Sequence, residues 1–209
     1  MHPPRLILAS ASPARRQLLR QIGIEPVVCP SGVDEEAITA PDPQTLVRTL
    51  ATAKAQAVAR RFDPPGVVLG CDSLLELDGV VHGKPETPEA AVAQLEKLSG
   101  RHGHLHTGHT LIDLSTGETL SRVATTQVFF ARLTPAQISA YVQTGEPLQC
   151  AGAFALEGKG GLWVERLTGC PSNVIGLSLP LLREMMQHLG YDLTQYWESK
   201  VLQTSSQDC

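Results

Sequence analysis

The junction between residues 5 and 19 constrains the fold most, because it joins a buried strand to a capped helix within a few residues. The apolar run 6–9 predicts the strand, and Pro13 stands where a helix begins, with Ser12 as its N-cap. Such a junction directs free backbone N–H groups and the positive end of the helix dipole toward one point. Ser10, Ser12 and Arg15 converge there, which suits a phosphate chain. Taken alone, the segment fits an ordinary capped helix with surface arginines better than a phosphate site.

Strand and helix signals alternate along the rest of the chain, which predicts an α/β fold with a long mixed sheet flanked by helices. An Asp-Gly pair at 78–79 indicates a hairpin turn. Strands are expected at 6–9, 25–29, 67–71, 74–77, 80–82, 104–114, 119–133 and 162–167. Helices are expected from 13 to a stop at 23, over 43–62, between 87 and 100, from 134, and over 180–189. Residues 1–193 should form one domain of two closely packed lobes, followed by a polar C-terminal tail at 194–209.

Composition excludes several function classes. The 209 residues are 42% hydrophobic and 18% charged, with a net charge of −4, which argues against a protein that coats nucleic acid. A small polyanionic ligand needs only a few local cations and stays compatible with that charge. Apolar runs are too short for a membrane span, and no signal peptide is recognisable at the start.

The cysteines and histidines show no metal-ligand spacing. The five cysteines include no CxxC pair, so we expect reduced thiols and a cytoplasmic protein, with Cys71 as a small buried core residue. His102, His104 and His106 alternate and should share one face of a strand. A polar strand face explains this run better than a zinc site, which needs ligands from separate elements.

Two acidic positions are candidates for catalysis or metal binding. Asp72 follows a buried strand, where a functional carboxylate is common in α/β sheets, although a structural turn cap is the alternative. The acidic run 34–36 could supply a second carboxylate to a cation shared with Asp72. Magnesium prefers carboxylate oxygens together with the phosphates of a substrate.

Two lysines and a glycine-rich segment complete the candidates. Lys54 lies in the expected long helix, near its alanine-lined face, where it either extends to solvent or serves an anionic site. Lys84 precedes a proline, which keeps it extended on a loop. Segment 150–161 carries several glycines, which permit close approach to a ligand, and one acid, Glu157.

The order of these motifs closely resembles the Maf family of nucleotide pyrophosphatases. The resemblance covers about residues 6–187, and each motif is weak while the ordered series is specific. The motifs are SxSPxRRxLL, VDE, LAxxKA, GxDS, DGxxxGKP, LSGR, TG, CAGxFxxEGxG and NxxGLxLP.

This resemblance implies an elongated α/β fold related to the inosine triphosphate pyrophosphatases and a homodimer. It implies cleavage of a nucleoside triphosphate between its α- and β-phosphates, with a divalent cation, Mg²⁺ or Mn²⁺. By position, Asp72 resembles the proton acceptor that activates water, and Glu35 with Asp72 the metal-facing acids. The phosphate-binding positions are Ser10, Ser12, Arg15, Lys54 and Lys84.

The base preference depends on three positions of the resemblance, Ala14, Ser73 and Glu157. Glu157 favours guanine, because a carboxylate accepts from the two adjacent donors of the guanine Watson–Crick edge. Ala14 and Ser73 do not match the 7-methyl-GTP branch, which tends to carry tryptophan and glutamine there. The base therefore stays open, with a 7-methyl-GTP type slightly favoured over a dTTP/UTP type.

Two other functions remain as alternatives. A non-catalytic nucleotide-binding regulator is one, since the resembling family has been linked to septum formation and cell-division arrest. Asp72 together with the full set of cations favours catalysis over that alternative. A general phosphatase is the other, and it would release orthophosphate in place of pyrophosphate.

Overall fold

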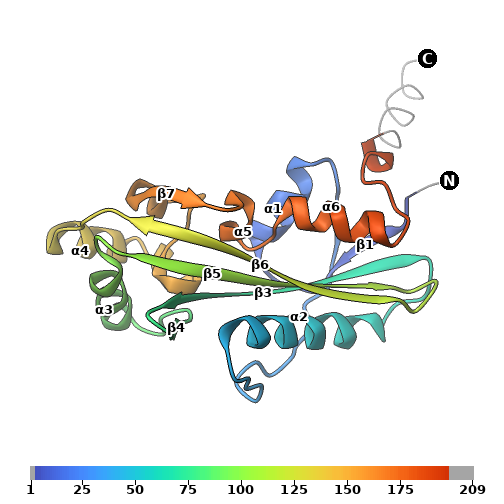
Figure 1. Ribbon diagram of the computed structural model, residues 1–209, viewed down its shortest axis with the longest axis horizontal. Helices are drawn as coiled ribbons and strands as arrows, with labels where there is room; N and C mark the ends of the chain where they lie inside the picture. Colours follow the sequence, from blue (N-terminus) through green and yellow to red (C-terminus); the bar gives the residue numbers. More distant parts are fainter. Residues whose placement is uncertain (1–2, 198–209) are drawn as a thin grey trace.

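Three twelve-residue strands run the length of the molecule and form the centre of its sheet (Figure 1). They are β3 (Gly66–Leu77), β5 (His102–Asp113) and β6 (Thr119–Phe130). The computed structural model describes residues 3–197, and within them the seven strands follow the order β2-β1-β3-β5-β6-β7, with β4 paired to β3. The expected elongated mixed α/β sheet is thereby confirmed.

Shorter strands extend this sheet at both ends of β3. β1 (Arg5–Leu8) lies parallel to β3 and to β2 (Val27–Val28). β4 (Val80–His82) is antiparallel to the far end of β3, and β7 (Val164–Thr168) is antiparallel to β6. The Asp78-Gly79 hairpin turn is confirmed, since both residues have positive φ, at 52° and 77°.

Local sequence signals start the helices. Five of the six α-helices within residues 3–197 begin after a side-chain N-cap and carry proline in the first turn. The helices are α1 (Pro13–Gln21), α2 (Pro43–Ala59), α3 (Pro88–Leu98), α4 (Pro135–Gln143), α5 (Pro171–Ile175) and α6 (Leu179–His188). Three 3₁₀ helices, which the sequence did not predict, are η1 (Glu146–Gln149), η2 (Ala151–Ala153) and η3 (Lys159–Trp163).

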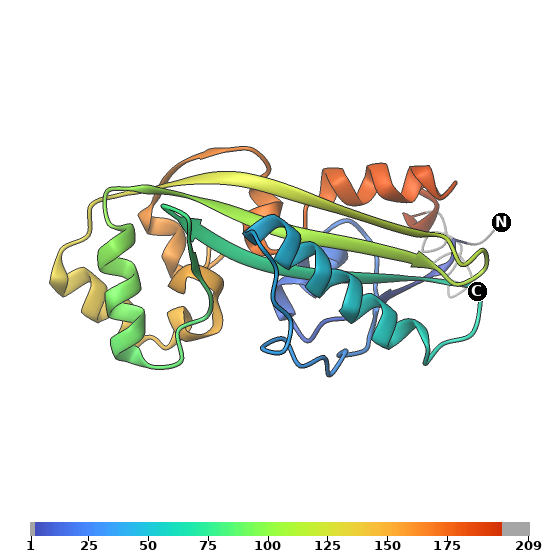
Figure 2. The ribbon, with the colours of Figure 1, turned by 60° about the horizontal axis from the view of Figure 1, so that its bottom comes forward.

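The helices divide between the two faces and the two ends of the sheet. α2 covers one face, whereas α1 and α6 lie on the opposite face (Figures 1 and 2). α3 and α4 pack at the end where β4 lies and form a core cluster of their own with β3, β5 and β6. Cys71 is fully buried in the cluster under α1 and α6, as expected. Apolar side chains are therefore buried in separate clusters along one continuous sheet.

Asp72 lies in the middle of a strand, and the expectation that it ends one was wrong. β3 continues to Leu77 because its ladder to β5 is unbroken from Val67 to Glu76. The polar pair Asp72-Ser73 resembles a strand end in the local sequence. In the structure, pairing with β5 satisfies the backbone hydrogen-bonding groups of both residues. The separate strands expected at 67–71 and 74–77 are thus one element.

The C-terminal expectation also changes, because residues 194–197 belong to the packed body. Tyr196 Oη donates to Pro4 O at 2.5 Å, and Trp197 Nε1 donates to Ile22 O at 2.5 Å. The remainder of the expected tail, 198–209, lies outside the described residues.

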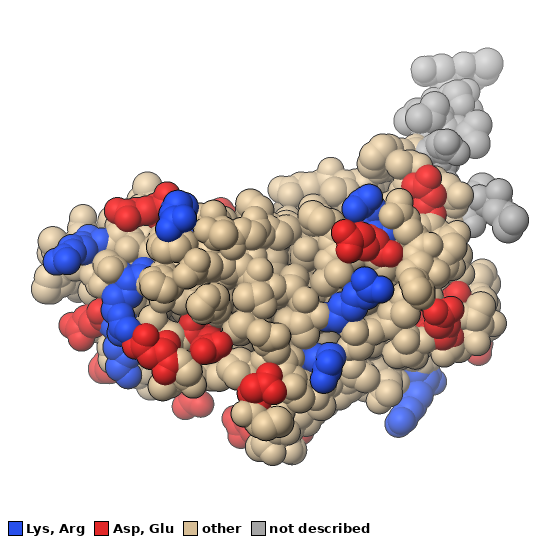
Figure 3. All heavy atoms as spheres, in the orientation of Figure 1, with Lys and Arg blue, Asp and Glu red and all other residues tan. Residues whose placement is uncertain are grey.

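The surface carries charges of both signs, and the three alternating histidines lie on β5. Acidic and basic side chains are interspersed on the face seen in Figure 3. His102 and His104 are exposed on β5, but His106 is buried, with ring nitrogens bonded to Thr125 Oγ1 and Glu76 Oε2. No helix within residues 3–197 is long and apolar enough to cross a membrane.

Candidate active site

The edge of β3 is open between its two shorter partners. β1 pairs with β3 up to Leu69, and β4 pairs with it only from Leu75 onward. Between them, residues 70–74 have β5 on one side and no described strand on the other. Asp72 is at the centre of this open stretch. β1 and β4 pair with β3 on either side of this open stretch.

The turn after β1 brings the first group of predicted residues to the open edge. Ser10 Oγ accepts hydrogen bonds from Ser12 N and from Arg15 Nη1, both at 3.1 Å. Ser12 Oγ in turn caps α1 by accepting from Arg15 N at 3.4 Å. The predicted junction therefore forms, with the helix N-terminus beside both hydroxyls.

Arg15 is buried and makes more contacts inside the protein than the sequence indicated. Its Nε donates to Gly176 O at 2.8 Å, and Nη1 donates to Cys71 O at 2.9 Å as well as to Ser10. Nη2 donates to Ser73 Oγ at 3.1 Å. Four of the five guanidinium N–H donors are thus occupied, so Arg15 retains one for a ligand.

A hydrogen-bond chain continues from Arg15 across the sheet. Ser73 Oγ and Thr107 Oγ1 are 2.9 Å apart, and Thr107 Oγ1 donates to Asn173 O at 3.1 Å. With the Thr107 proton committed to Asn173, the Ser73 hydroxyl donates to Thr107. The sequence did not identify Thr107 and Asn173 as individual site residues. Only the TG and NxxGLxLP motifs pointed to them, because a buried threonine in a strand has no distinctive local pattern.

Lys54, Glu35 and Asp72 meet on the opposite face of β3. The Lys54 ammonium lies 2.5 Å from Asp72 Oδ1 and 2.7 Å from Glu35 Oε1. Lys54 and Asp72 are buried, while Glu35 is exposed on the loop before α2. Burial raises the pKa of Asp72, although the charges of Lys54 and Arg15 oppose this rise. Lys54 therefore does not extend to solvent, which was one of its two expected roles, and its binding of an anionic ligand stays a prediction.

No described hydrogen bond or ion pair joins Lys84 or Glu157 to the Asp72 group, and their charges act on Cys150. Burial raises the pKa of the Cys150 thiol to about 11; the negative charge of Glu157 adds to this rise and the positive charge of Lys84 opposes it. Gly152 N donates to Gly83 O at 3.1 Å, which joins the glycine-rich segment to the loop bearing Lys84.

The three positions expected to select the base are distributed over these groups. Ala14 is half-buried at the start of α1, and Ser73 belongs to the Arg15 hydrogen-bond chain. Glu157 is exposed and makes no hydrogen bond or ion pair to another described residue. Among the described residues, no such contact joins Ala14, Ser73 and Glu157.

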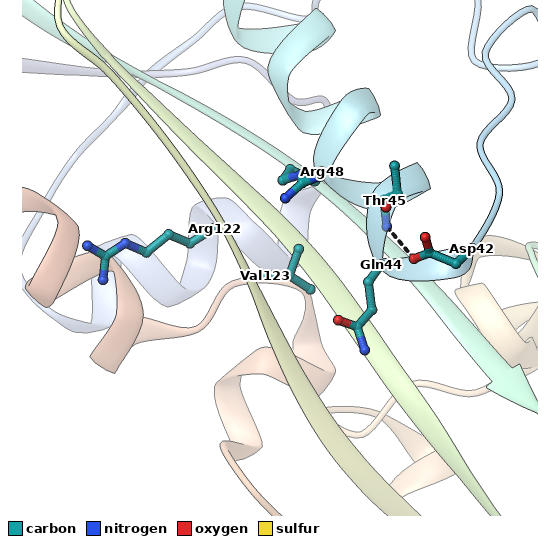
Figure 4. A pocket seen from close by; sticks show the side chains of 6 residues that line it. All are labelled: Asp42, Gln44, Thr45, Arg48, Arg122 and Val123. Carbon is teal, nitrogen blue, oxygen red and sulfur yellow. Dashed lines mark hydrogen bonds between the residues drawn. The ribbon is translucent and has the colours of Figure 1, made fainter.

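A hollow of about 360 Å³ lies elsewhere, at the start of α2 (Figure 4). It is lined by residues of α2, its N-cap and β6, where Asp42 Oδ1 accepts from Thr45 N at 2.8 Å. None of the predicted site residues lines it. Its lining residues are Asp42, Gln44, Thr45, Arg48, Arg122 and Val123.

Comparisons with known proteins cover the part of the chain that carries these residues. The profile of the Maf family, described as Maf-like protein, matches residues 5–189. A nucleoside triphosphate pyrophosphatase of Rippkaea orientalis is 55% identical over 200 residues, covering 96% of this chain and 97% of that protein. A nucleoside triphosphate pyrophosphatase of Thermosynechococcus vestitus is 54% identical over 194 residues, covering 93% and 98%.

Among solved structures, the Ham1 protein of Staphylococcus aureus aligns with 61% of this chain and 72% of its own, at 18% identity and a TM-score of 0.42. The family profile extends from β1 into the segment that follows α6, and it includes every predicted site residue. This chain belongs to the Maf family.

Proposed function

We propose that the protein is a nucleoside triphosphate pyrophosphatase, a hydrolase that cleaves the α–β phosphate bond and releases a nucleoside monophosphate and pyrophosphate. The open edge of β3 carries this proposal, because the buried carboxylate of Asp72 lies there beside two buried cations, Lys54 from α2 and Arg15 from α1. The relatives named above, at more than half identity over nearly the full chain, support the reaction class.

The phosphate chain would be bound by Ser10, Ser12, Arg15, Lys54 and Lys84. The first three contribute hydroxyls, one free guanidinium donor and the N-terminus of α1. The ammonium of Lys54 adds charge from the α2 face. Neutralising the phosphates while a water is positioned supplies most of what phosphoryl transfer requires.

Asp72 would accept the proton of the attacking water. Its burial raises the pKa, which makes the carboxylate a stronger base than an exposed aspartate. The neighbouring Lys54 and Arg15 oppose this effect and keep the carboxylate available in its ionised form.

Glu35 and Asp72 would hold a divalent cation, Mg²⁺ or Mn²⁺, together with the phosphates of the substrate. The donor set fits, because one oxygen of each carboxylate already lies within 2.7 Å of a single positive centre, the Lys54 ammonium. When bound, such a cation neutralises phosphate charge and lowers the pKa of water. Lys54 would then turn toward the phosphates and leave the two carboxylates to the cation.

Glu157 would recognise the base, and a guanine-type substrate is slightly favoured over dTTP or UTP. Its carboxylate is exposed and bonds only its own backbone N–H among the described residues, so it can also accept from two adjacent donors of a base. Partial loss of surrounding water raises the pKa of Glu157, and the charge of Glu146 adds to this rise. Ser73 and Ala14 would shape the site from the other side of the open edge.

Pyrophosphate release from UTP, dTTP, GTP and 7-methyl-GTP, with Mg²⁺ or Mn²⁺, tests the proposal. Asp72→Asn should lower kcat by about 10²- to 10⁴-fold, because it removes the proton acceptor and keeps the shape. Asp113→Asn is the control, since Asp113 is equally buried but bonds Tyr191 and Ser115 away from the edge. It should retain turnover.

Near-normal turnover by Asp72→Asn would remove Asp72 from this role. Nucleotide binding by the wild-type protein without any release would favour the regulator of septum formation instead. Orthophosphate in place of pyrophosphate would indicate the general phosphatase.

A further inference from the structure

Two side chains outside the proposed site hold the segment 155–160, which carries Glu157. Tyr141 Oη, from α4, donates to Glu146 Oε1 at 2.8 Å and accepts from Ala155 N at 3.2 Å. The backbone is therefore fixed two residues before Glu157.

Glu146, in η1, fixes the same segment on the other side. Its Oε1 accepts from Gly160 N at 3.0 Å, and its Oε2 accepts from Lys159 N at 3.1 Å. With the bond from Ala155 included, three backbone N–H groups on either side of Glu157 donate hydrogen bonds to the Tyr141–Glu146 pair.

The protonation states of the pair suit these contacts. Burial raises the pKa of Tyr141, and its bond to Glu146 raises it further, so the phenol remains a donor. Burial works against ionisation of Glu146, but the bonds from Gly160, Lys159 and Tyr141 hold its pKa below the ordinary value. Glu146 therefore accepts as a carboxylate.

The segment packs against the pair as closely as a backbone can. A Cβ added at Gly160 would lie 2.4 Å from Tyr141 Oη, and one added at Gly158 would lie 2.6 Å from Glu146 Oε2. A Cβ at Gly160 would also meet the backbone of Ala155 at 2.8 Å, whereas one at Gly158 would meet only the Glu146 carboxylate.

Among the described residues, the only hydrogen bond to the Glu157 carboxylate comes from its own backbone N–H. Its position relative to a bound base is then decided by the backbone on either side of it. The N–H groups of that backbone donate hydrogen bonds to Tyr141 and Glu146.

We propose that Tyr141 and Glu146 are positioning residues that set the base preference by fixing the segment that presents Glu157. This inference rests on the proposed role of Glu157 in base recognition. Removing one anchor should allow Glu157 to move, and a displacement of about 1 Å at a recognition group is enough to change rates strongly.

The experiment compares Tyr141→Phe and Glu146→Gln with wild type over the four triphosphates. Glu146→Gln is nearly isosteric, but its amide nitrogen cannot accept from Lys159 or Gly160. Tyr191→Phe is the matched control, because it removes a phenol that donates to Asp113 at 3.0 Å. The readout is the ratio of kcat/KM between the best and second-best base. This ratio is independent of how much of a preparation is folded, so a loss of stability alone does not change it.

Both variants should reduce this ratio about tenfold, while Tyr191→Phe should keep the wild-type ratio. In a Glu157→Gln background, neither variant should change the ratio further, since they act through Glu157. If Glu157→Gln changes the ratio but Tyr141→Phe and Glu146→Gln do not, the positioning role is wrong and the role of Glu157 survives. If Glu157→Gln leaves the ratio unchanged, base recognition by Glu157 fails and the inference fails with it.

Discussion

Asp72 shows how single charges are balanced at the open edge. Burial favours its neutral form, whereas Lys54 at 2.5 Å and the nearby Arg15 favour the carboxylate. Breaking such a buried pair by removing one partner leaves an uncompensated charge, which is strongly destabilising. Lys54 and Asp72 therefore depend on each other structurally as well as in the proposed reaction.

His109 is a second buried titratable group near this edge, and it is held neutral. Its Nδ1 donates to Thr107 O at 3.0 Å, and its Nε2 accepts from Ser178 N at 2.9 Å. An imidazolium could not accept from Ser178. Burial lowers the pKa of His109 to about 4; the bond to Thr107 raises it, and the charge of Arg15 lowers it further.

His109 should make stability depend on pH below neutrality. The unfolded chain binds its proton near pH 6.5 and the folded protein only near pH 4, so the unfolded state holds more protons between these values. The stabilisation is therefore complete above pH 6.5 and is lost as pH falls toward 4. At about 1.4 kcal/mol per pH unit, the loss amounts to roughly 3 kcal/mol.

Urea unfolding between pH 7.5 and 4.5 measures this effect. His109→Asn should be less stable at pH 7.5 and should show a shallower decline toward acid than wild type. An equally steep decline in the variant would contradict the assignment to His109.

Among the elements, α2 matters most for the site, because it carries Lys54 to Asp72. The helix lies directly on the sheet where β3 and β5 carry glycine. A Cβ at Gly70 would lie 2.2 Å from Ala51 O, and one at Gly108 would lie 2.1 Å from Val47 O. These approaches set the depth at which the helix packs and thus the distance that Lys54 spans.

Gly108→Ala should force α2 away from β5 and lower the free energy of unfolding by about 1–3 kcal/mol, because backbone atoms have to move. Pyrophosphate release should fall as well, since Lys54 moves with the helix. Gly83→Ala is the stability control, because its added Cβ meets nothing within 4 Å. Its change should stay within about 0.5 kcal/mol. Unchanged stability of Gly108→Ala in chemical denaturation would show that α2 can adjust without cost.

At the scale of the whole molecule, the long strands hold the two ends of the sheet in fixed relation. β1 and β4 pair with the same strand, β3, and leave its edge open between them at residues 70–74. α6 packs in the same core cluster as α1, and the last described residues contact the beginning of the described chain. A hollow of about 530 Å³ between α1, α6 and the last described turn is lined by Trp197 and Leu193.

Homodimer formation and a cytoplasmic location stay predictions.

The contacts of residues 194–197 should contribute measurably to stability. Tyr196 and Trp197 each donate a hydrogen bond to backbone near the N-terminal end, and Tyr196 packs on the cluster under α1 and α6. A chain ended after residue 193 should therefore be less stable than one ended after residue 197 by about 1–3 kcal/mol. Thermal unfolding of the two chains compares them directly. Equal melting temperatures would mean that these contacts do not stabilise the fold.

The sequence by itself determined the elements and most of the candidate residues. The start of the first helix followed from Ser12 before Pro13, and the hairpin followed from Asp78-Gly79. Such signals act over a few residues, so they can be recognised without the fold. The ordered motifs identified the family for the same reason.

Only the tertiary structure decided how these residues are used. Lys54 reaches Asp72 across 18 residues, and Arg15 reaches Gly176 across 161, so no local pattern indicates either contact. β3 runs through Asp72 because β5 pairs with it there, which overrides a polar pair that resembles a strand end. The Tyr141–Glu146 anchor depends on close packing of a distant backbone. Contacts between distant parts of the chain exist only after the sheet has brought those parts together, and for this reason they could not be predicted from sequence.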